Sequence, residues 1–303
     1  MKNIPFHAAF SEYLHHRGLS AKTRQTIQKT ISKLIAWAEG ENIPIEQLSY
    51  SEMLAYISHC KQKGNSKKTQ QQEVSNSNHY FKYLIEIGER EDNPASNIQI
   101  QGLTRQQLYD TLKPEELQAI WQGYVEKVPN SINGQHIHTR NKIVLALIIH
   151  QGIRPEEIGK LTVQDIQIRE GKITIPGARR SNPRTLPLEG HQLYELIDYI
   201  HRIRPQIEQQ SGKRSVQLII GHGTKDHITN IMTQIIRSLT EQNPRVQSIK
   251  QIRASVITNW LKQHGLRKVQ HMAGHRYVSS TESYQRNNIE ALQDDITRYH
   301  PDL

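Results

Sequence analysis

The sequence is poor in cysteine, in aromatic residues and in long apolar runs. It has one cysteine, Cys60, among 303 residues, and only 6% of the residues are aromatic. A single cysteine excludes an intramolecular disulfide and fits a reducing compartment. The longest apolar run, residues 143–149, is far too short to cross a membrane. The N-terminal stretch lacks the apolar core of a signal peptide, so we expect a cytoplasmic protein with no membrane partner.

Acidic residues are also scarce. Lys and Arg number 39 against 29 Asp and Glu, which gives a formal net charge of +10. A positive surplus of this size is typical of proteins that bind a polyanion, and nucleic acid is the first candidate. The stretch IIGHGTKD lacks the Gly-Lys-Ser/Thr of a phosphate-binding loop. No carboxylate cluster suggests a metal, so we expect neither a metal nor another cofactor.

The first hundred residues predict helices. Apolar residues recur at helical spacing in three stretches that each end at a glycine, residues 23–40, 49–64 and 65–88. The core positions expected in the first and third stretches are Ile27, Ile31, Leu34, Ile35, Ala38, Val74, Tyr80, Tyr83, Leu84 and Ile87.

Basic residues gather near the ends of these predicted helices. Lys22 and Arg24 lie at the start of the first, and Lys67 and Lys68 lie at the start of the third. A solvated helix surface would explain each of them singly. Their density suits contacts with DNA phosphates.

The helical pattern breaks at "NPA", residues 93–95, and a new helix is predicted from Pro114. We therefore expect two domains, residues 1–97 and 111–303, joined by a linker over 98–110. In the second, isoleucines alternate on both sides of a Glu-Gly turn at residues 166–175, and "RTLPL" offers a third short strand. The predicted fold is mainly α, with a small antiparallel β-sheet in the second domain.

Three stretches of the second domain could carry chemistry. Arg154 lies between a helix that ends at Gly152 and another that opens at Pro155, and Glu157 could pair with an arginine and fix its rotamer. Lys250 and Arg253 are three residues apart near a helix start, where an anion would relieve their repulsion.

The third stretch is HMAGHRYVSSTESYQR. A glycine breaks the chain before His275, and the serines and threonine that follow favour the start of a helix carrying Tyr284. The tyrosine lies nine residues after the histidine.

Taken in order, these motifs resemble those of the tyrosine recombinases, the family of phage integrases and Xer-type recombinases. That family combines an arginine in G-[LI]-R-x-x-E-[IL] with [HK]-x-x-R, G-H and a tyrosine nine residues beyond the histidine. The matching residues here are Gly152 to Ile158, Lys250 to Arg253, Gly274-His275 and Tyr284. The resemblance covers about residues 5–295.

The resemblance implies a site-specific DNA recombinase that needs no ATP. Residues 1–97 would form a helical core-binding domain and residues 111–303 the catalytic domain, holding double-stranded DNA between them. It implies a homotetramer on two DNA sites, associated with the nucleoid and typical of mobile elements. Integration, excision, inversion and chromosome-dimer resolution would all use the same chemistry.

The implied roles fall on the motif residues. Tyr284 would attack a DNA phosphate to give a 3′-phosphotyrosine, and Arg154 and Arg253 would hold the phosphate oxygens. Lys250 would add a further donor. His275 would donate a hydrogen bond to the phosphate or assist the proton of the tyrosine.

One departure from the family concerns the proton for the leaving 5′-oxygen. Family members usually carry a lysine in the turn after the second strand, whereas this turn reads PGARRSNPR. The candidates for general acid or electrostatic substitute are therefore Lys172, Arg179, Arg180 and Lys250. The missing lysine also leaves an alternative open, a catalytically impaired DNA-binding member of the family.

Overall fold

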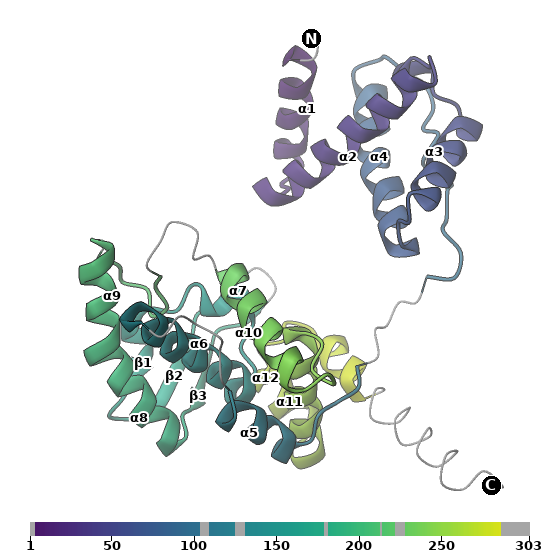
Figure 1. Ribbon diagram of the computed structural model, residues 1–303. Coiled ribbons are helices and arrows are strands. Elements are labelled where there is room, and N and C mark those ends of the chain that lie inside the picture. The colour runs from purple at the N-terminus through teal and green to yellow at the C-terminus, as the bar shows by residue number, and fades with distance from the viewer. Residues whose placement is uncertain are drawn as a thin grey trace, which may run out of the picture. The chain divides into compact units, whose positions relative to one another are not determined.

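The computed structural model describes residues 4–103, 109–124, 131–178, 181–212, 214–221 and 228–285, with side chains from residue 8 onward (Figure 1). The chain divides into two compact units, Met1–Arg105 and Gln106–Leu303. Each has its own hydrophobic core. No helix in the described ranges has the length and apolar character needed to span a membrane.

The first unit is helical, as the sequence predicts. Its N-terminal α1 packs on α2 and α4, and α4 also contacts α2 and α3. Ser20, Ser49 and Ser66 cap the starts of α2, α3 and α4, each accepting a hydrogen bond from a backbone N–H three residues on. The elements are α1 (Ile4–His16), α2 (Ala21–Gly40), the short 3₁₀ helix η1 (Ile45–Gln47), α3 (Tyr50–Gln62) and α4 (Lys67–Glu86).

The core of the first unit matches the helical spacing, with one exception at its end. Eight of the ten positions expected above are buried, and Ile35 is half-buried against the same core. Ile87 is 49% exposed, so that prediction is wrong. The reason is that α4 ends at Glu86, and Ile87 follows as the C-cap. Ile98 and Ile100 pack on this core too.

The second unit combines a small sheet with helices. Helix α6 is buried over residues 143–149 and ends at Gln151. Its C-cap Gly152 has a left-handed φ of 55°, and a Cβ there would lie 3.1 Å from the ring of Trp260. The helices are α5 (Pro114–Gln122), α6 (Ile132–Gln151), α7 (Pro155–Ile158), the 3₁₀ helix η2 (Val163–Asp165), α8 (Gly190–Asp198), the π-helical turn η3 (Tyr199–Ile203), α9 (Arg204–Ser211), α10 (Ile228–Gln242), α11 (Ile249–Gln263) and α12 (Leu266–Met272).

The sheet confirms the predicted hairpin and third strand. Strands β1 (Ile166–Gln167), β2 (Lys172–Ile175) and β3 (Arg184–Pro187) lie in the order β1-β2-β3 and are antiparallel throughout. In the pairing of β2 with β3, Ile173 faces Leu186 and Ile175 faces Arg184. All four of these residues are buried, so Arg184 lies on the core face of the sheet.

Candidate active site

The first part of the site is the loop between α6 and α7. Arg154 is the N-cap of α7, and its backbone N–H donates a 2.9 Å hydrogen bond to Oε2 of Glu157. The Nη1 atom of Arg154 lies 3.6 Å from Oε1 of the same carboxylate, which is an ion pair at longer than hydrogen-bond length. Glu157 is 1% exposed. Glu157 therefore fixes the backbone of Arg154, while the guanidinium of Arg154 retains N–H donors that can bind another group.

Arg184, on β3, completes the pairing of Glu157 and was not predicted. Its Nη1 and Nη2 donate to the two carboxylate oxygens of Glu157, each at 2.9 Å. Burial of this carboxyl would raise its pKa, but the hydrogen bonds and charge of Arg184 and the backbone bond from Arg154 lower the pKa of Glu157 to about 2. Glu157 is therefore a fixed anion that joins α7 to the sheet.

The second part of the site is the turn after α12. Gly274 has a left-handed φ of 64°, and a Cβ there would lie 2.4 Å from Nη1 of Arg184. Its carbonyl accepts a hydrogen bond from the backbone of Asn182, and Ser181 forms a β-bridge with His275. Contacts with the β2–β3 loop thus fix His275, which is 3% exposed.

Arg253, on α11, lies in direct contact with His275 of this turn. Nη2 of Arg253 is 3.3 Å from Nε2 of His275 and donates to the carbonyl of Ala273 at 2.8 Å. The other ring nitrogen, Nδ1, lies 2.9 Å from Oγ1 of Thr281. Because a guanidinium can only donate, Nε2 of His275 must be its unprotonated nitrogen and Nδ1 carries the hydrogen toward Thr281.

The charges in the site are concentrated and positive. Burial, followed by the charges of Arg253, Arg154 and Arg184, lowers the pKa of His275 to about 3, so the ring is neutral at physiological pH. Burial and the charge of Arg154 lower the pKa of Arg253 to about 9, which leaves it protonated. Among the described residues, Nη1 of Arg154 and Nη1 of Arg253 are buried and have no hydrogen-bond partner. Two guanidinium donors without hydrogen-bond partners, in one cluster of positive charge, can bind an oxyanion.

Tyr284 lies beside these groups, as the spacing of the sequence predicted. Residues 279–285 are helical. The ring of Tyr284 stacks on the imidazole of His275, with ring centroids 5.7 Å apart and planes at 10°. It also packs against the small cluster of Ile257, Val269 and Ala273. Tyr284 is half-buried, so its ring is held while part of its surface stays accessible.

The remaining predicted residues are less closely associated. Lys250 lies on α11 with Arg253, but it is exposed whereas Arg253 is buried. Lys172 is the first residue of β2 and pairs with Pro187, whereas Arg184 pairs with Ile175 at the other end of the strand. At about 3.3 Å per residue that separation is roughly 10 Å. Arg179 and Arg180 lie outside the described residues.

Lys172 also points away from the site. Side chains alternate between the faces of a strand, and Lys172 is exposed while its neighbour Ile173 is in the core. The distance along the strand and the opposite face both argue against Lys172 as a proton donor. In the first unit, Lys22, Lys67 and Lys68 are exposed at the starts of α2 and α4, whereas Arg24 donates to the carbonyl of Leu19.

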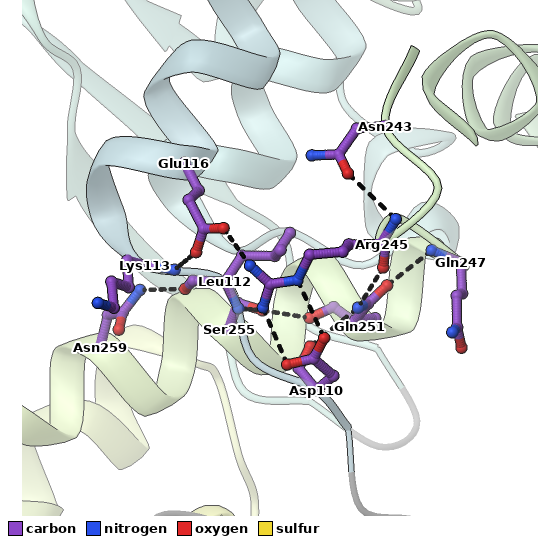
Figure 2. A network of polar contacts seen from close by, with 10 residues as sticks. All are labelled: Asp110, Leu112, Lys113, Glu116, Asn243, Arg245, Gln247, Gln251, Ser255 and Asn259. Atoms are coloured by element: carbon purple, nitrogen blue, oxygen red, sulfur yellow. Dashed lines mark hydrogen bonds and ion pairs between the residues drawn. The ribbon is translucent and has the colours of Figure 1, made fainter. Parts of the chain in front are cut away.

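Helix α11, which carries Arg253, is anchored by a second polar network at its start (Figure 2). Gln251, Ser255 and Asn259 recur every four residues and bond the backbone of the segment that precedes α5. Gln251 donates to the carbonyl of Asp110, Ser255 accepts from the N–H of Leu112, and Asn259 donates to the carbonyl of Leu112, at 2.8–2.9 Å. These bonds fix the position of the helix that presents Arg253.

The fold and these motifs coincide with those of one family. Residues 110–290 match the Phage integrase family, and residues 6–88 match the N-terminal SAM-like domain of phage integrases. The chain therefore belongs to the phage integrase family and is a tyrosine recombinase, an enzyme that cuts and rejoins DNA strands.

Individual relatives agree with this assignment. The chain is 23% identical over 302 residues to the tyrosine recombinase XerD of Oceanobacillus iheyensis, covering 97% of this chain and 98% of the relative. It is 24% identical to the tyrosine recombinase XerC of Listeria innocua, covering 96% of each. Among solved structures, XerH bound to a palindromic difH substrate shares the fold with a TM-score of 0.70, at 16% identity, over 93% of this chain and 81% of that one.

Proposed function

We propose that this protein recombines DNA at specific sites through Tyr284, with Arg154 and Arg253 as the phosphate clamp. The observation that carries the proposal is the pair of free Nη1 atoms beside a tyrosine ring held on His275. Buried donors without a hydrogen-bond partner are costly, and the oxygens of an oxyanion would accept from both. A DNA phosphodiester has the required charge and two non-bridging oxygens.

In the proposed reaction the Tyr284 oxygen forms a bond to the scissile phosphorus, and the bond from phosphorus to the 5′-oxygen breaks. The products are a 3′-phosphotyrosine and a free 5′-hydroxyl, and attack by another 5′-hydroxyl reverses the step. The bond energy is kept in the phosphotyrosine, so no ATP is consumed. Arg154 and Arg253 stabilise the negative charge that grows on the non-bridging oxygens.

We propose that His275 hydrogen-bonds the phosphate or assists the proton of Tyr284. Its ring is neutral, and its pKa of about 3 makes it a weak base until the negative charge of a bound phosphate raises that pKa. Glu157 supports Arg154, and Lys250 is placed on the same helix as Arg253, where its exposed ammonium can reach bound DNA.

For the leaving 5′-oxygen, we propose that Lys250 donates the proton or that Arg179 and Arg180 substitute electrostatically. A substrate with sulfur at the bridging 5′ position identifies the proton donor. A thiol has a pKa of about 8.5, so its thiolate leaves without being protonated. Replacing the true donor with alanine will slow cleavage of the oxygen substrate and spare the sulfur one. Arg154→Ala will slow both. Sulfur rescue by none of the three variants would remove this part of the proposal.

The membership of the family also suggests how the domains and protomers bind DNA. We propose that residues 1–97 are the core-binding domain, with Lys22, Arg24, Lys67 and Lys68 on DNA phosphates, and that residues 111–303 are the catalytic domain. A lambda integrase tetramer bound to a Holliday junction shares the fold, with a TM-score of 0.64, 15% identity and coverage of 91% of this chain and 74% of that one. We propose a homotetramer on two DNA sites, acting at the nucleoid on a mobile element.

A nicked suicide substrate tests the function. The short fragment that carries the free 5′-hydroxyl diffuses away after cleavage, so the covalent complex accumulates and shifts on a denaturing gel. We expect an adduct with the wild-type protein and none with Tyr284→Phe, which keeps the packed ring and therefore DNA binding. An adduct with Tyr284→Phe would overturn the assignment. DNA binding by the wild type with no adduct would favour the catalytically impaired alternative.

A further inference from the structure

Two arginines share one carboxylate beneath the proposed phosphate site. Arg184 takes both oxygens of Glu157 at 2.9 Å, whereas the nearest nitrogen of Arg154 stays 3.6 Å from Oε1. A bidentate arginine–carboxylate pair is the strongest form of this contact, and Glu157 can form it in plane with only one partner. In this structure that partner is Arg184.

The two arginines differ in what they can reach. The side chain of Arg184 is 0% exposed, so it cannot touch DNA, whereas that of Arg154 is 26% exposed at the edge of the site. If Glu157 lost Arg184, its buried charge would draw in the remaining cation. Arg154 is the one at hand, because Glu157 already holds its backbone N–H.

We propose that Arg184 is a positioning residue that saturates Glu157 and so keeps the guanidinium of Arg154 free for the scissile phosphate. The inference rests on the proposed function, in which Arg154 binds that phosphate. Without Arg184, Glu157 captures Arg154 and the phosphate loses a donor. Arg184 thus acts on the reaction through two other residues and never contacts the substrate.

Gly274 lies directly against the guanidinium of Arg184. A Cβ at this position would lie 2.4 Å from Nη1 and 2.8 Å from Cζ of Arg184. The left-handed φ of 64° also favours glycine. The guanidinium of Arg184 therefore rests against the backbone that leads into His275. Glycine at this position leaves the space in which the guanidinium of Arg184 reaches Glu157.

The test replaces Arg184 alone, and then Arg184 together with Glu157. Arg184→Met should lower the rate of covalent adduct formation by about 10²-fold, the loss typical of a catalytic group displaced by about 1 Å, with DNA affinity changed less than tenfold. Adding Glu157→Gln removes the charge that captures Arg154, so the double variant should regain at least about tenfold of the lost rate. The rate is expressed per folded molecule, because Glu157→Gln also removes an unpaired buried charge and so restores stability. A purely structural role for Arg184 predicts recovery of the unfolding free energy without rescue of this rate.

Two further variants separate the possible causes. Arg204→Met is the matched control, because Arg204 is also a buried arginine of this unit and bonds the carbonyls of Ser215 and Gln217. It should leave the rate within a few-fold of wild type. Arg154→Ala/Arg184→Met should be no slower than Arg154→Ala, because Arg184 acts through Arg154.

The outcomes are distinct. No rescue by Glu157→Gln, or a wild-type rate for Arg184→Met, overturns the inference while the proposed function stands. If Arg184→Met does not fold, Arg184→Lys keeps the charge but lacks the planar fork; it should fold, lose at least about tenfold in rate and show the same rescue. A wild-type protein that forms no adduct overturns the inference and the proposed function together.

Discussion

The active site and the network of Figure 2 are both polar, both include arginines and carboxylates, and both involve α11, yet they differ in one respect. In the network, Arg245 holds Asp110 with two hydrogen bonds and Glu116 with a third. None of the ten residues drawn has a buried side-chain nitrogen or oxygen without a partner. In the active site, Arg154, Arg184 and Arg253 each keep one such nitrogen. The network of Figure 2 is satisfied within the protein, whereas the arginines of the active site have donors left for an anion.

The largest difference should appear on replacing Arg253. Arg253→Met removes a donor to the phosphate, so we expect the cleavage rate to fall by about 10²–10³-fold, as for loss of one oxyanion donor. The same change removes a cation whose burial lowers its pKa to about 9. We therefore expect the unfolding free energy to be unchanged or higher. Single-turnover cleavage and urea unfolding measure the two, and a less stable protein with normal cleavage would reverse the comparison.

A substitution in the network of Figure 2 should instead lower stability and leave cleavage nearly unchanged. Ser255→Ala leaves the buried N–H of Leu112 without its acceptor, which costs about 1–3 kcal/mol of unfolding free energy. Cleavage per folded molecule should change less than a few-fold, because Ser255 touches no residue of the active site in the contacts described above. Thr258→Ala is a suitable control on the same helix, since the buried hydroxyl of Thr258 has no hydrogen-bond partner among the described residues. Equal destabilisation by both substitutions would contradict the account.

A smaller difference between the two regions should appear in how the unfolding free energy depends on pH. His275 has a pKa of about 3 when folded, below the value of about 6.5 in an unfolded chain. Below pH 6.5 the unfolded state takes up the proton first, so this group lowers stability as pH falls from 6.5 toward 3. The slope is at most about 1.4 kcal/mol per pH unit.

His275→Gln should remove that part of the slope between pH 6.5 and 5, measured by urea unfolding, whereas Ser255→Ala should leave it unchanged. Glu157, whose pKa is lowered from 4.5 to about 2, stabilises the fold above its ordinary pKa and loses that contribution mainly as pH falls from 4.5 toward 2, below the range compared here. An unaltered slope in His275→Gln would mean that the ring is protonated in the native protein.

Much of this arrangement could be predicted from the sequence because it is local. Helical spacing identifies α2, α3 and α4 of the first unit but not α1, and the Gly152–Arg154–Pro155 junction places Arg154 at the N-cap of α7. The alternation of isoleucines identifies the hairpin. Each of these depends on residues a few positions apart.

What escaped prediction depends on contacts between distant segments. Arg184 lies in a stretch that reads as an ordinary short strand, and its partner Glu157 is 27 residues away. A weak signal was present, because Arg184 shares its strand face with buried Leu186, and an arginine on the core face requires a buried anion. The unprotonated Nε2 of His275 likewise depends on its contact with Arg253, 22 residues away.

The most direct test of the central claim is to locate the DNA on the protein. After reaction with a suicide substrate, the DNA is digested to a short remnant, and the peptides are mapped by mass spectrometry. The account predicts the remnant on Tyr284 alone, although Tyr277 in the same segment is 67% exposed and more accessible. A remnant on Tyr277 or any other residue would contradict the claim that Tyr284, held on His275 beside two free arginine donors, is the nucleophile.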